Sequence, residues 1–433
     1  MQVSVESTGP LERRIAVEVP AERVEREVDN KLRALGRTAK IKGFRPGKVP
    51  LKVVQQQYGD QVRQEVLGDL LQATYSEALD QEKLQPAGRP RIEPEQQAPG
   101  EAFRYTAIIE VFPEVKLQGL DQIEVSRPLV EIGDDDVDKL LQRIRRQHAE
   151  WEPVERKSAD GDQLVVDFEG SIDGEPFEGG KAEKATVELG AGRMLKDFEK
   201  GLTGVQAGQD LSFKVNFPKD YNAEHLAGKK AVFKAHVHSV SAPRLPEVDD
   251  AFAERLGMSE GGVSRLMEEL RKSMEREVEQ ATQGRVKQQV LDQLYEKNPI
   301  ELPTPLVDEE IRRLQQDMVQ RMGMGEDSQP DLPRELFEEE ARKRVALGLL
   351  VGEVIREHEI RIEEDRVRQA IGRLVAGQEN PEETARAYLS DPDTRRGIEA
   401  MVMEEQVVDL LLESATVKDQ KTSFEDLVSQ GQG

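Results

Sequence analysis

Eight residues near the N-terminus combine backbone-shaping and charged side chains in a way that could bind an anion. They read Gly43-Phe44-Arg45-Pro46-Gly47-Lys48-Val49-Pro50. Glycine relaxes the backbone, proline stiffens it, and neither favours a helix interior, so the stretch is predicted to be a shaped loop. The window from Lys31 to Lys52 holds eight Lys or Arg and no Asp or Glu, whereas the whole chain carries a formal charge of −24. The remaining residues therefore sum to −32, an asymmetry that indicates docking onto a polyanion.

The composition of this loop allows three interpretations. The first is an ordinary helix–helix connector whose cations are solvated. The second is a phosphate-binding P-loop, which requires G-x-x-x-x-G-K-[ST] after a buried strand; here the two glycines are one residue too close and Val49 replaces Ser or Thr, which excludes it. The third is a docking loop in which Arg45 and Lys48 reach phosphates or carboxylates while Phe44 adds apolar contact. In that case the two prolines reduce the entropy lost on binding.

Other candidate sites are weaker. The chain has no cysteine, which excludes disulfides, thiol catalysis and thiolate metal sites. His236 and His238 share one face of an expected strand and could ligate a metal, but no third ligand lies nearby in the sequence, so a solvent-facing pair is favoured. The run Asp134-Asp135-Asp136 lacks the glycine and terminal glutamate of a calcium loop. We therefore expect no metal and no cofactor.

Length and composition bound the fold. At 433 residues the chain has room for roughly three domains of ~150 residues each. Charged residues make up 34% and aromatic residues only 4%, which favours thin aliphatic cores and elongated helical pieces. No run of about 18 apolar residues occurs and the first residues lack the pattern of a signal peptide, so we expect a soluble, cytoplasmic protein with no membrane partner. A pI near 4.9 argues against nonspecific nucleic-acid coating.

The pattern along the chain predicts an α+β multidomain protein. Within residues 1–112, the first part alternates as strands, two helices then flank the loop, and a further strand covers 103–112. Residues 113–149 begin as an extended connector and end as a helix. Residues 150–245 are rich in glycine and short strands with one short helix near 194–200, typical of a compact antiparallel β domain. Residues 246–433 are overwhelmingly helical, with one very long pattern over 263–297 and a polar end.

The basic loop resembles the ribosome-docking signature of bacterial trigger factor. As in that family it is followed by Tyr58-Gly59 and then by Val62-Arg63-Gln64-Glu65-Val66-Leu67, and the resemblance covers essentially the whole chain. It implies that the N-terminal domain sits at the nascent-chain exit of the large ribosomal subunit, on ribosomal protein and rRNA. The family's contact positions match Phe44, Arg45 and Lys48, whereas Pro46 stands where the family often has a basic residue.

The middle domain resembles an FKBP-like prolyl isomerase. The motifs are Val166-Asp167-Phe168-Glu169-Gly170, Phe177-Glu178-Gly179-Gly180, Leu189-Gly190-Ala191-Gly192-Arg193-Met194-Leu195 and Phe217-Pro218-Lys219-Asp220-Tyr221. Taken singly, each apolar residue could be ordinary core, but six of the chain's 12 Phe fall between positions 168 and 233. Position by position, the resemblance implies a pocket lined by Phe168, Phe177, Met194, Leu195, Phe198, Tyr221 and Phe233. Such a pocket needs no nucleophile, because an apolar cavity that strips water from an X-Pro amide favours the twisted state.

The helical C-terminal region indicates a further function beside docking and isomerisation. A helix of about 35 residues spans roughly 50 Å, too long for a small core to cover. In trigger factor the C-terminal helices form a body with two arms, to which residues 113–149 and 246–433 would both contribute. Scattered apolar patches, from Met318 to Met324 and from Val345 to Ile355, would hold unfolded and nascent polypeptides without ATP. A homodimer off the ribosome is a further implication.

The leading hypothesis is therefore a ribosome-associated chaperone with prolyl isomerase activity. One alternative is a plain FKBP-type isomerase whose flanking domains only oligomerise it. Another is a scaffold or nucleic-acid-binding protein that uses the basic loop and has a silent middle domain.

Overall fold

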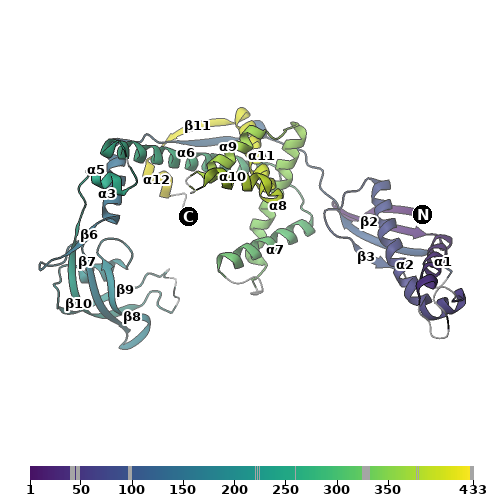
Figure 1. The fold of residues 1–433 in the computed structure, drawn as a ribbon, viewed down its shortest axis with the longest axis horizontal. Helices are drawn as coiled ribbons and strands as arrows, with labels where there is room; N and C mark the ends of the chain where they lie inside the picture. The colour runs from purple at the N-terminus through teal and green to yellow at the C-terminus, as the bar shows by residue number, and fades with distance from the viewer. Residues whose placement is uncertain are drawn as a thin grey trace. The chain divides into compact units, whose positions relative to one another are not determined.

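A computed structural model describes residues 1–39, 44, 49–95, 100–219, 221, 223, 225–258, 260–323, 332–376, 378 and 380–429 (Figure 1). The chain divides into two compact units. The first consists of Met1–Arg127 and Gly284–Gln420, and the second of Pro128–Gln283 and Lys421–Gly433. The expected α+β multidomain class is confirmed, because both units combine antiparallel strands with helices.

The first unit begins with a four-stranded antiparallel sheet in the order β1-β2-β4-β3. Its strands are β1 (Gln2–Ser7), β2 (Glu12–Val19), β3 (Arg91–Pro94) and β4 (Phe103–Glu110). Alternate residues of β2 and β4 face the core in register, with Val17 opposite Tyr105 and Val19 opposite Phe103. This period-two alternation is the sequence signal that predicted the strands.

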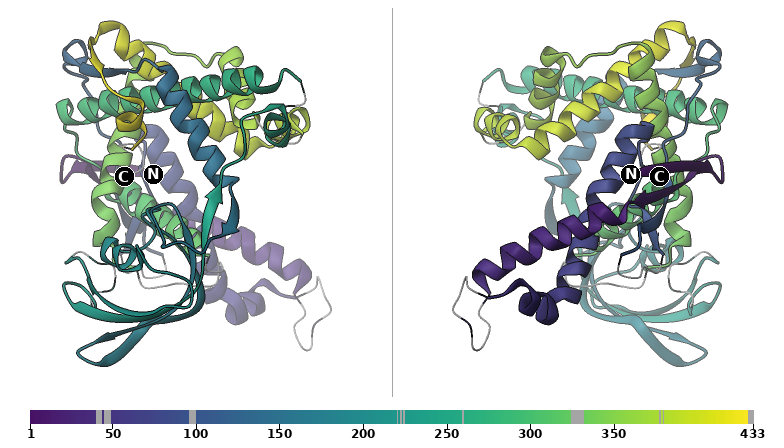
Figure 2. Two further views of the ribbon diagram at one scale, coloured as in Figure 1. Left: turned by 90° about the vertical axis from the view of Figure 1, so that its left-hand side faces the viewer. Right: turned by 90° about the vertical axis from the view of Figure 1, so that its right-hand side faces the viewer.

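Two helices cover one face of this sheet. They are α1 (Ala21–Thr38) and α2 (Leu51–Glu82), which pack against each other (Figures 1 and 2). Helical spacing places Val24, Val28 and Leu32 of α1 in the core, where each is at most 6% exposed. Inside this core the Thr74 and Tyr105 hydroxyls share a hydrogen bond of 2.9 Å.

The rest of the first unit is mainly helical. It contains η1 (Leu120–Gln122), the end of α6 (Gly262–Lys297), α7 (Thr304–Arg321), α8 (Glu335–Glu357), α9 (Glu364–Val375), α10 (Pro381–Ser390) and α11 (Pro392–Ser414). Three small aliphatic clusters hold these helices together instead of one thick core. The connector before η1 is fastened to α6 by the buried Asn298, whose Oδ1 accepts the Gln118 N–H at 2.7 Å. The strands β5 (Glu124–Leu129) and β11 (Thr416–Lys421) then pair with each other.

The second unit carries a five-stranded antiparallel sheet. Its strands are β6 (Glu150–Pro153), β7 (Gln163–Ile172), β8 (Glu175–Glu188), β9 (Asp210–Asn216) and β10 (Lys230–Arg244). They run in the order β6-β10-β7-β8, with β9 also on β10. A two-residue turn, Asp173-Gly174, joins β7 to β8; both residues have positive φ, as the tight hairpin requires. The seven-residue α4 (Lys196–Leu202) packs on this sheet's apolar face.

Four further helical segments complete the second unit. They are α3 (Asp134–Gln147), α5 (Asp250–Arg255), the first part of α6, and α12 (Phe424–Ser429). The acidic run Asp134–Asp136 forms the first turn of α3, where Asp136 Oδ2 accepts the Gly133 N–H at 3.0 Å. Carboxylates at a helix N-terminus are stabilised by its dipole, so this run is a cap.

Some details differ from the sequence-based expectations. The strand β3 was not predicted, and the polar C-terminal end forms β11 and α12. Residues from Val345 to Ile355 were expected on a client-facing surface, but Ala346, Leu350 and Val354 of α8 are at most 1% exposed. The long helix was predicted correctly: α6 covers Gly262–Lys297.

Candidate functional site

The apolar face of the β6–β10 sheet carries a cavity of about 490 Å³. The structure brings all seven side chains suggested for the pocket to its wall. Strands β7, β8 and β10 supply Phe168, Phe177 and Phe233. Helix α4 and its N-cap supply Phe198 and Leu195, because positions three apart on a helix share a face. The remaining two are Met194 and Tyr221.

The aromatic rings form a connected cluster. Phe198 lies edge-on to Phe168 and Phe233, each with a centroid separation of 5.1 Å. Phe177 lies edge-on to Phe233 at 6.0 Å and to Phe217 at 5.9 Å. Edge-to-face pairs at these distances are favourable and fix ring orientation. The cavity wall is therefore preorganised by aromatic contacts.

Burial divides this cavity into a floor and a rim. The floor is apolar and at most 6% exposed: Phe198, Phe217, Leu226 and Phe233. Met194 is 36% exposed at the rim, beside the exposed Glu178, Arg193 and His225. The cavity therefore combines an apolar floor with a rim that carries charged and polar side chains.

The strand β7 comes close to the rings because it has a glycine at position 170. A Cβ on Gly170 would lie 2.7 Å from Phe233 Cε1 and 2.9 Å from Phe177 Cε1. Any side chain there would displace at least one of the two rings. Gly170 is therefore part of the site's construction.

The arrangement suits rotation about a peptide bond. Planarity of an X-Pro amide creates a barrier of about 18–20 kcal/mol, and the isomers interconvert in tens to hundreds of seconds unaided. An apolar floor removes the water that stabilises the planar, polar amide. No group on this floor has to take or give a proton for the reaction to proceed.

Comparisons with known proteins agree with this geometry. Residues 154–238 match the family model of FKBP-type peptidyl-prolyl cis-trans isomerases. Residues 1–144 match that of bacterial trigger factor protein, and residues 262–413 that of its C-terminus. The trigger factor of Alkalilimnicola ehrlichii is 49% identical over 100% of this chain and 96% of its own length, and that of Thioalkalivibrio sulfidiphilus 48% identical over 99% and 98%. The chain belongs to the trigger factor family.

Membership settles the class of activity. The chain is a chaperone of the trigger factor family with an FKBP-type prolyl isomerase domain, as the sequence predicted. A solved structure titled "Promiscuous Substrate Recognition in Folding and Assembly Activities of the Trigger Factor Chaperone" aligns with a TM-score of 0.49 and 20% identity, covering 95% of this chain and 99% of that one.

The basic loop is described only in part. Phe44 is 41% exposed. Pro50 is the N-cap of α2, and its carbonyl oxygen accepts the Val53 N–H at 3.0 Å. Val49 is half-buried against the N-terminal core. The other predicted docking residues, Gly43, Arg45, Pro46, Gly47 and Lys48, lie outside the described residues, as does Met324.

Part of the basic window is neutralised from α2. Lys31 Nζ lies 2.8 Å from Glu65 and 2.7 Å from Asp69, and hydrogen bonds to these two carboxylates raise the pKa of Lys31. The sequence window contains no acidic residue, so these partners were invisible to a local charge count. The positive charge available for docking is therefore displaced toward the loop.

The His236–His238 pair lies on the outer face of the sheet, away from the cavity. His236 Nδ1 is 2.7 Å from Asp210 Oδ1, and His238 Nε2 is 2.8 Å from Asp167 Oδ2. Hydrogen bonds from the Lys184 N–H and from His238 lower the pKa of Asp167. Within the described part of the chain, no group of three or more His, Asp or Glu could hold a metal.

Among the residues that the structure describes, no helix is long and apolar enough to cross a membrane.

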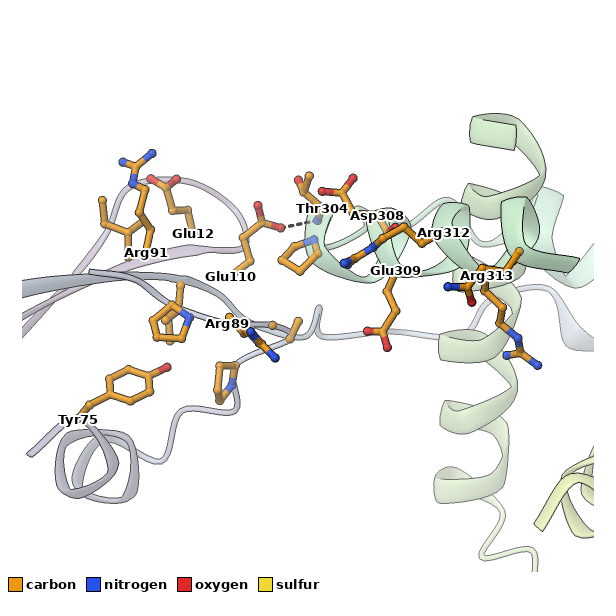
Figure 3. Close-up of a pocket in the computed structure, with 18 residues that line it drawn as sticks. Glu12, Tyr75, Arg89, Arg91, Glu110, Thr304, Asp308, Glu309, Arg312 and Arg313 are labelled. Carbon is orange, nitrogen blue, oxygen red and sulfur yellow. Dashed lines mark hydrogen bonds between the residues drawn. The ribbon is translucent and has the colours of Figure 1, made fainter. Parts of the chain in front are cut away.

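A wider cavity of about 1440 Å³ lies in the first unit, between β4 and α7 (Figure 3). There the Thr304 N–H donates to Glu110 Oε2 at 2.5 Å. Its charged wall residues are of both signs: Glu12, Glu110, Asp308, Glu309, Arg89, Arg91, Arg312 and Arg313. Apolar residues, among them Tyr75, Ile108 and Ile109, also line this cavity. Nothing in this mixed lining indicates a particular reaction, so we assign none to it.

Sequence reasoning missed several residues of the isomerase cavity. Phe217 and Leu226 belong to its floor, while Gly179, Gly192, Ala223 and His225 border its opening. Phe217 opens the motif that ends at Tyr221, so the signal for it was present. Ala223 and His225 carry no such signal, because a small or polar residue in a loop gives no indication of the cavity it borders.

Proposed function

We propose that the described cavity is the isomerase site and that Phe168, Phe177, Met194, Leu195, Phe198, Tyr221 and Phe233 act on the X-Pro bond. The observation that carries this is the convergence of these seven side chains on one cavity with an apolar floor. The floor desolvates the amide, while the edge-on rings hold the proline. The residues act by shape and polarity and transfer no proton.

The test of this site is a prolyl-peptide isomerisation assay on the full chain. Phe233→Ala should lower kcat/KM by about 30-fold, since it removes a ring contacted by four other rings. Circular dichroism checks that the variant stays folded. Wild-type kcat/KM in a folded Phe233→Ala protein would refute the assignment.

We also propose that residues 43–50 dock the chain on the large ribosomal subunit, with Phe44, Arg45 and Lys48 in contact with ribosomal protein and rRNA. Family membership supports this, as does the exposure of Phe44 between α1 and α2. Docking at the exit would bring the chain to nascent polypeptides and would locate the protein in the cytoplasm.

Ribosome co-sedimentation tests docking. The triple variant Phe44→Ala/Arg45→Ala/Lys48→Ala should reduce the bound fraction at least tenfold, because it removes two phosphate-binding cations and an apolar contact. Arg26→Ala is a control, since Arg26 lies on α1 in the same body and outside the loop. Co-sedimentation of the triple variant equal to that of wild type would exclude the loop as the element that docks on the ribosome.

The same proposal assigns the remaining regions. Residues 1–112 form the ribosome-binding domain, and residues 150–245 the isomerase domain. Residues 113–149 and 246–433 form the chaperone domain that binds unfolded polypeptide without ATP. Exposed Met318, Met322 and Leu336, at 39%, 54% and 71%, support a client surface on α7 and α8. Concentration-dependent sedimentation would detect a homodimer off the ribosome.

A further inference from the structure

One carboxylate joins two walls of the cavity without lining it. Glu199 follows Phe198 on α4 and is half-buried. Its Oε2 accepts the Gly190 N–H at 3.1 Å, and its Oε1 accepts the Met194 N–H at 3.4 Å. Both donors belong to the loop 190–194, which precedes the helix. The carboxylate therefore ties this loop to the helix that carries Phe198.

The loop needs such a tie because of its composition. Gly190 and Gly192 adopt φ values of +81° and +69°, in the left-handed region that favours glycine. Glycine-rich backbone loses more conformational entropy on ordering than other backbone does. The end of this loop nevertheless lines the cavity, through Gly192, Arg193 and Met194. An unanchored loop would leave one wall of the pocket poorly defined.

We propose that Glu199 is a positioning residue for the isomerase reaction, which holds the loop 190–194 at a fixed place relative to Phe198. This inference rests on the proposed isomerase site. The charge state matters because the two N–H groups are received by two different oxygens. Glutamine has the same shape, but its NH₂ would face one of the two donors, so it satisfies only one. Alanine satisfies neither.

The other end of the same helix offers a matched control. Ser158 Oγ donates to the Leu202 carbonyl at 2.7 Å and accepts the Val205 N–H at 3.0 Å. Ser158 is 4% exposed, so Ser158→Ala also removes two hydrogen bonds that involve α4 or the residues just after it. Neither bond reaches the loop 190–194. A loss of general stability would appear in both variants, whereas a loss of loop position would appear only at Glu199.

The experiment measures kcat/KM on a prolyl tetrapeptide and amide hydrogen exchange in the full chain. We expect Glu199→Ala to lower kcat/KM about tenfold and Glu199→Gln about threefold, since small displacements of a substrate-positioning wall reduce rates steeply. Exchange at Gly190 and Met194 should accelerate in the same order. Ser158→Ala should lower the thermal midpoint yet change kcat/KM less than about twofold.

Three outcomes would overturn the inference. One is wild-type kcat/KM in Glu199→Ala while exchange at Gly190 and Met194 accelerates, which would show a loop freed without consequence. Another is an equal loss in Ser158→Ala, which would make the effect one of stability. The third is an inactive wild-type chain, which would refute the isomerase site itself, whereas the first two leave that site standing.

Discussion

Two antiparallel sheets in this protein meet their helices in different ways. In the N-terminal body, α1 and α2, of 18 and 32 residues, cover the inner face of β1–β4. In the isomerase body, α4 has seven residues and covers only part of the inner face of β7–β10. The first inner face is filled mainly by aliphatic side chains, whereas the second presents a cluster of aromatic rings around a cavity.

The comparison shows how a core and a site differ on similar scaffolds. A long helix supplies enough apolar side chains to fill the space above a sheet, and the result is a closed core. A short helix leaves part of the sheet uncovered, and rigid aromatic rings can line that opening without collapsing into it. Phe198 marks the boundary, since it lies on the short helix and forms part of the cavity floor.

The largest effect is expected from opening the closed core. Leu32 of α1 is 1% exposed, so Leu32→Ala should destabilise the N-terminal body by about 2–5 kcal/mol. Hydrogen exchange of the Ile15 and Val17 amides in the full chain measures this locally. Isomerase activity should remain at the wild-type level. A parallel loss of activity would contradict the separation of the two bodies.

A methyl group added to the open site should have a smaller effect on stability and a specific effect on function. Gly170→Ala places a Cβ 2.7 Å from the Phe233 ring and should cost about 1–3 kcal/mol, with a marked loss of kcat/KM. The matched change in the other body is Gly68→Ala on α2, where, apart from the adjoining residues and the helix's own backbone, no described atom lies within 4 Å of the added Cβ. It should stabilise the helix by roughly 0.5–1 kcal/mol. Thermal unfolding and the peptide assay distinguish the two variants.

Acid should destabilise the isomerase body by protonating a buried carboxylate. Burial works to raise the pKa of Asp162, but hydrogen bonds from Arg156 and the Ala159 N–H outweigh it, so the pKa lies below the ordinary 3.8. A lowered pKa stabilises the fold above pH 3.8, and that contribution is lost as the pH falls below 3.8 toward the lowered value.

The variant Asp162→Asn tests the direction of this pH dependence of stability. The variant should be less stable than wild type at pH 7, and the difference should shrink as the pH falls below 3.8. Urea unfolding across this range provides the measurement. A difference that grows with acidity would contradict the assigned cause. In the N-terminal body, a hydrogen bond from the exposed Arg104 also lowers the pKa of Glu18, and there added salt should weaken the effect.

The sequence predicted features that depend on local pattern. We could recognise three such features in the sequence: the helical spacing of Val24, Val28 and Leu32, the length of α6, and the concentration of Phe near positions 168–233. The strand β3 was not, because Arg91–Pro94 is short, mostly polar and ends in proline. The burial of Leu350 and Val354 was missed because helical periodicity shows an apolar face without showing what covers it.

Partners distant in sequence were also beyond local reasoning. The pairing of Lys31 with Asp69 requires α1 and α2 to be adjacent, and that of His238 with Asp167 requires the β7–β10 register. The role inferred for Glu199 depends on a loop that folds back onto the helix. The set of pocket-lining residues came from resemblance to a family, whose motifs carry such long-range information in their order.

The central claim is that the aromatic cavity accelerates X-Pro rotation, and proline-limited refolding of an unrelated protein tests it most directly. The full chain should accelerate the slow phase, and Phe198→Ala should reduce that acceleration by at least tenfold, since the ring forms part of the cavity floor. Leu32→Ala, which leaves the cavity intact, should keep the acceleration. Full acceleration by a folded Phe198→Ala protein would contradict the account.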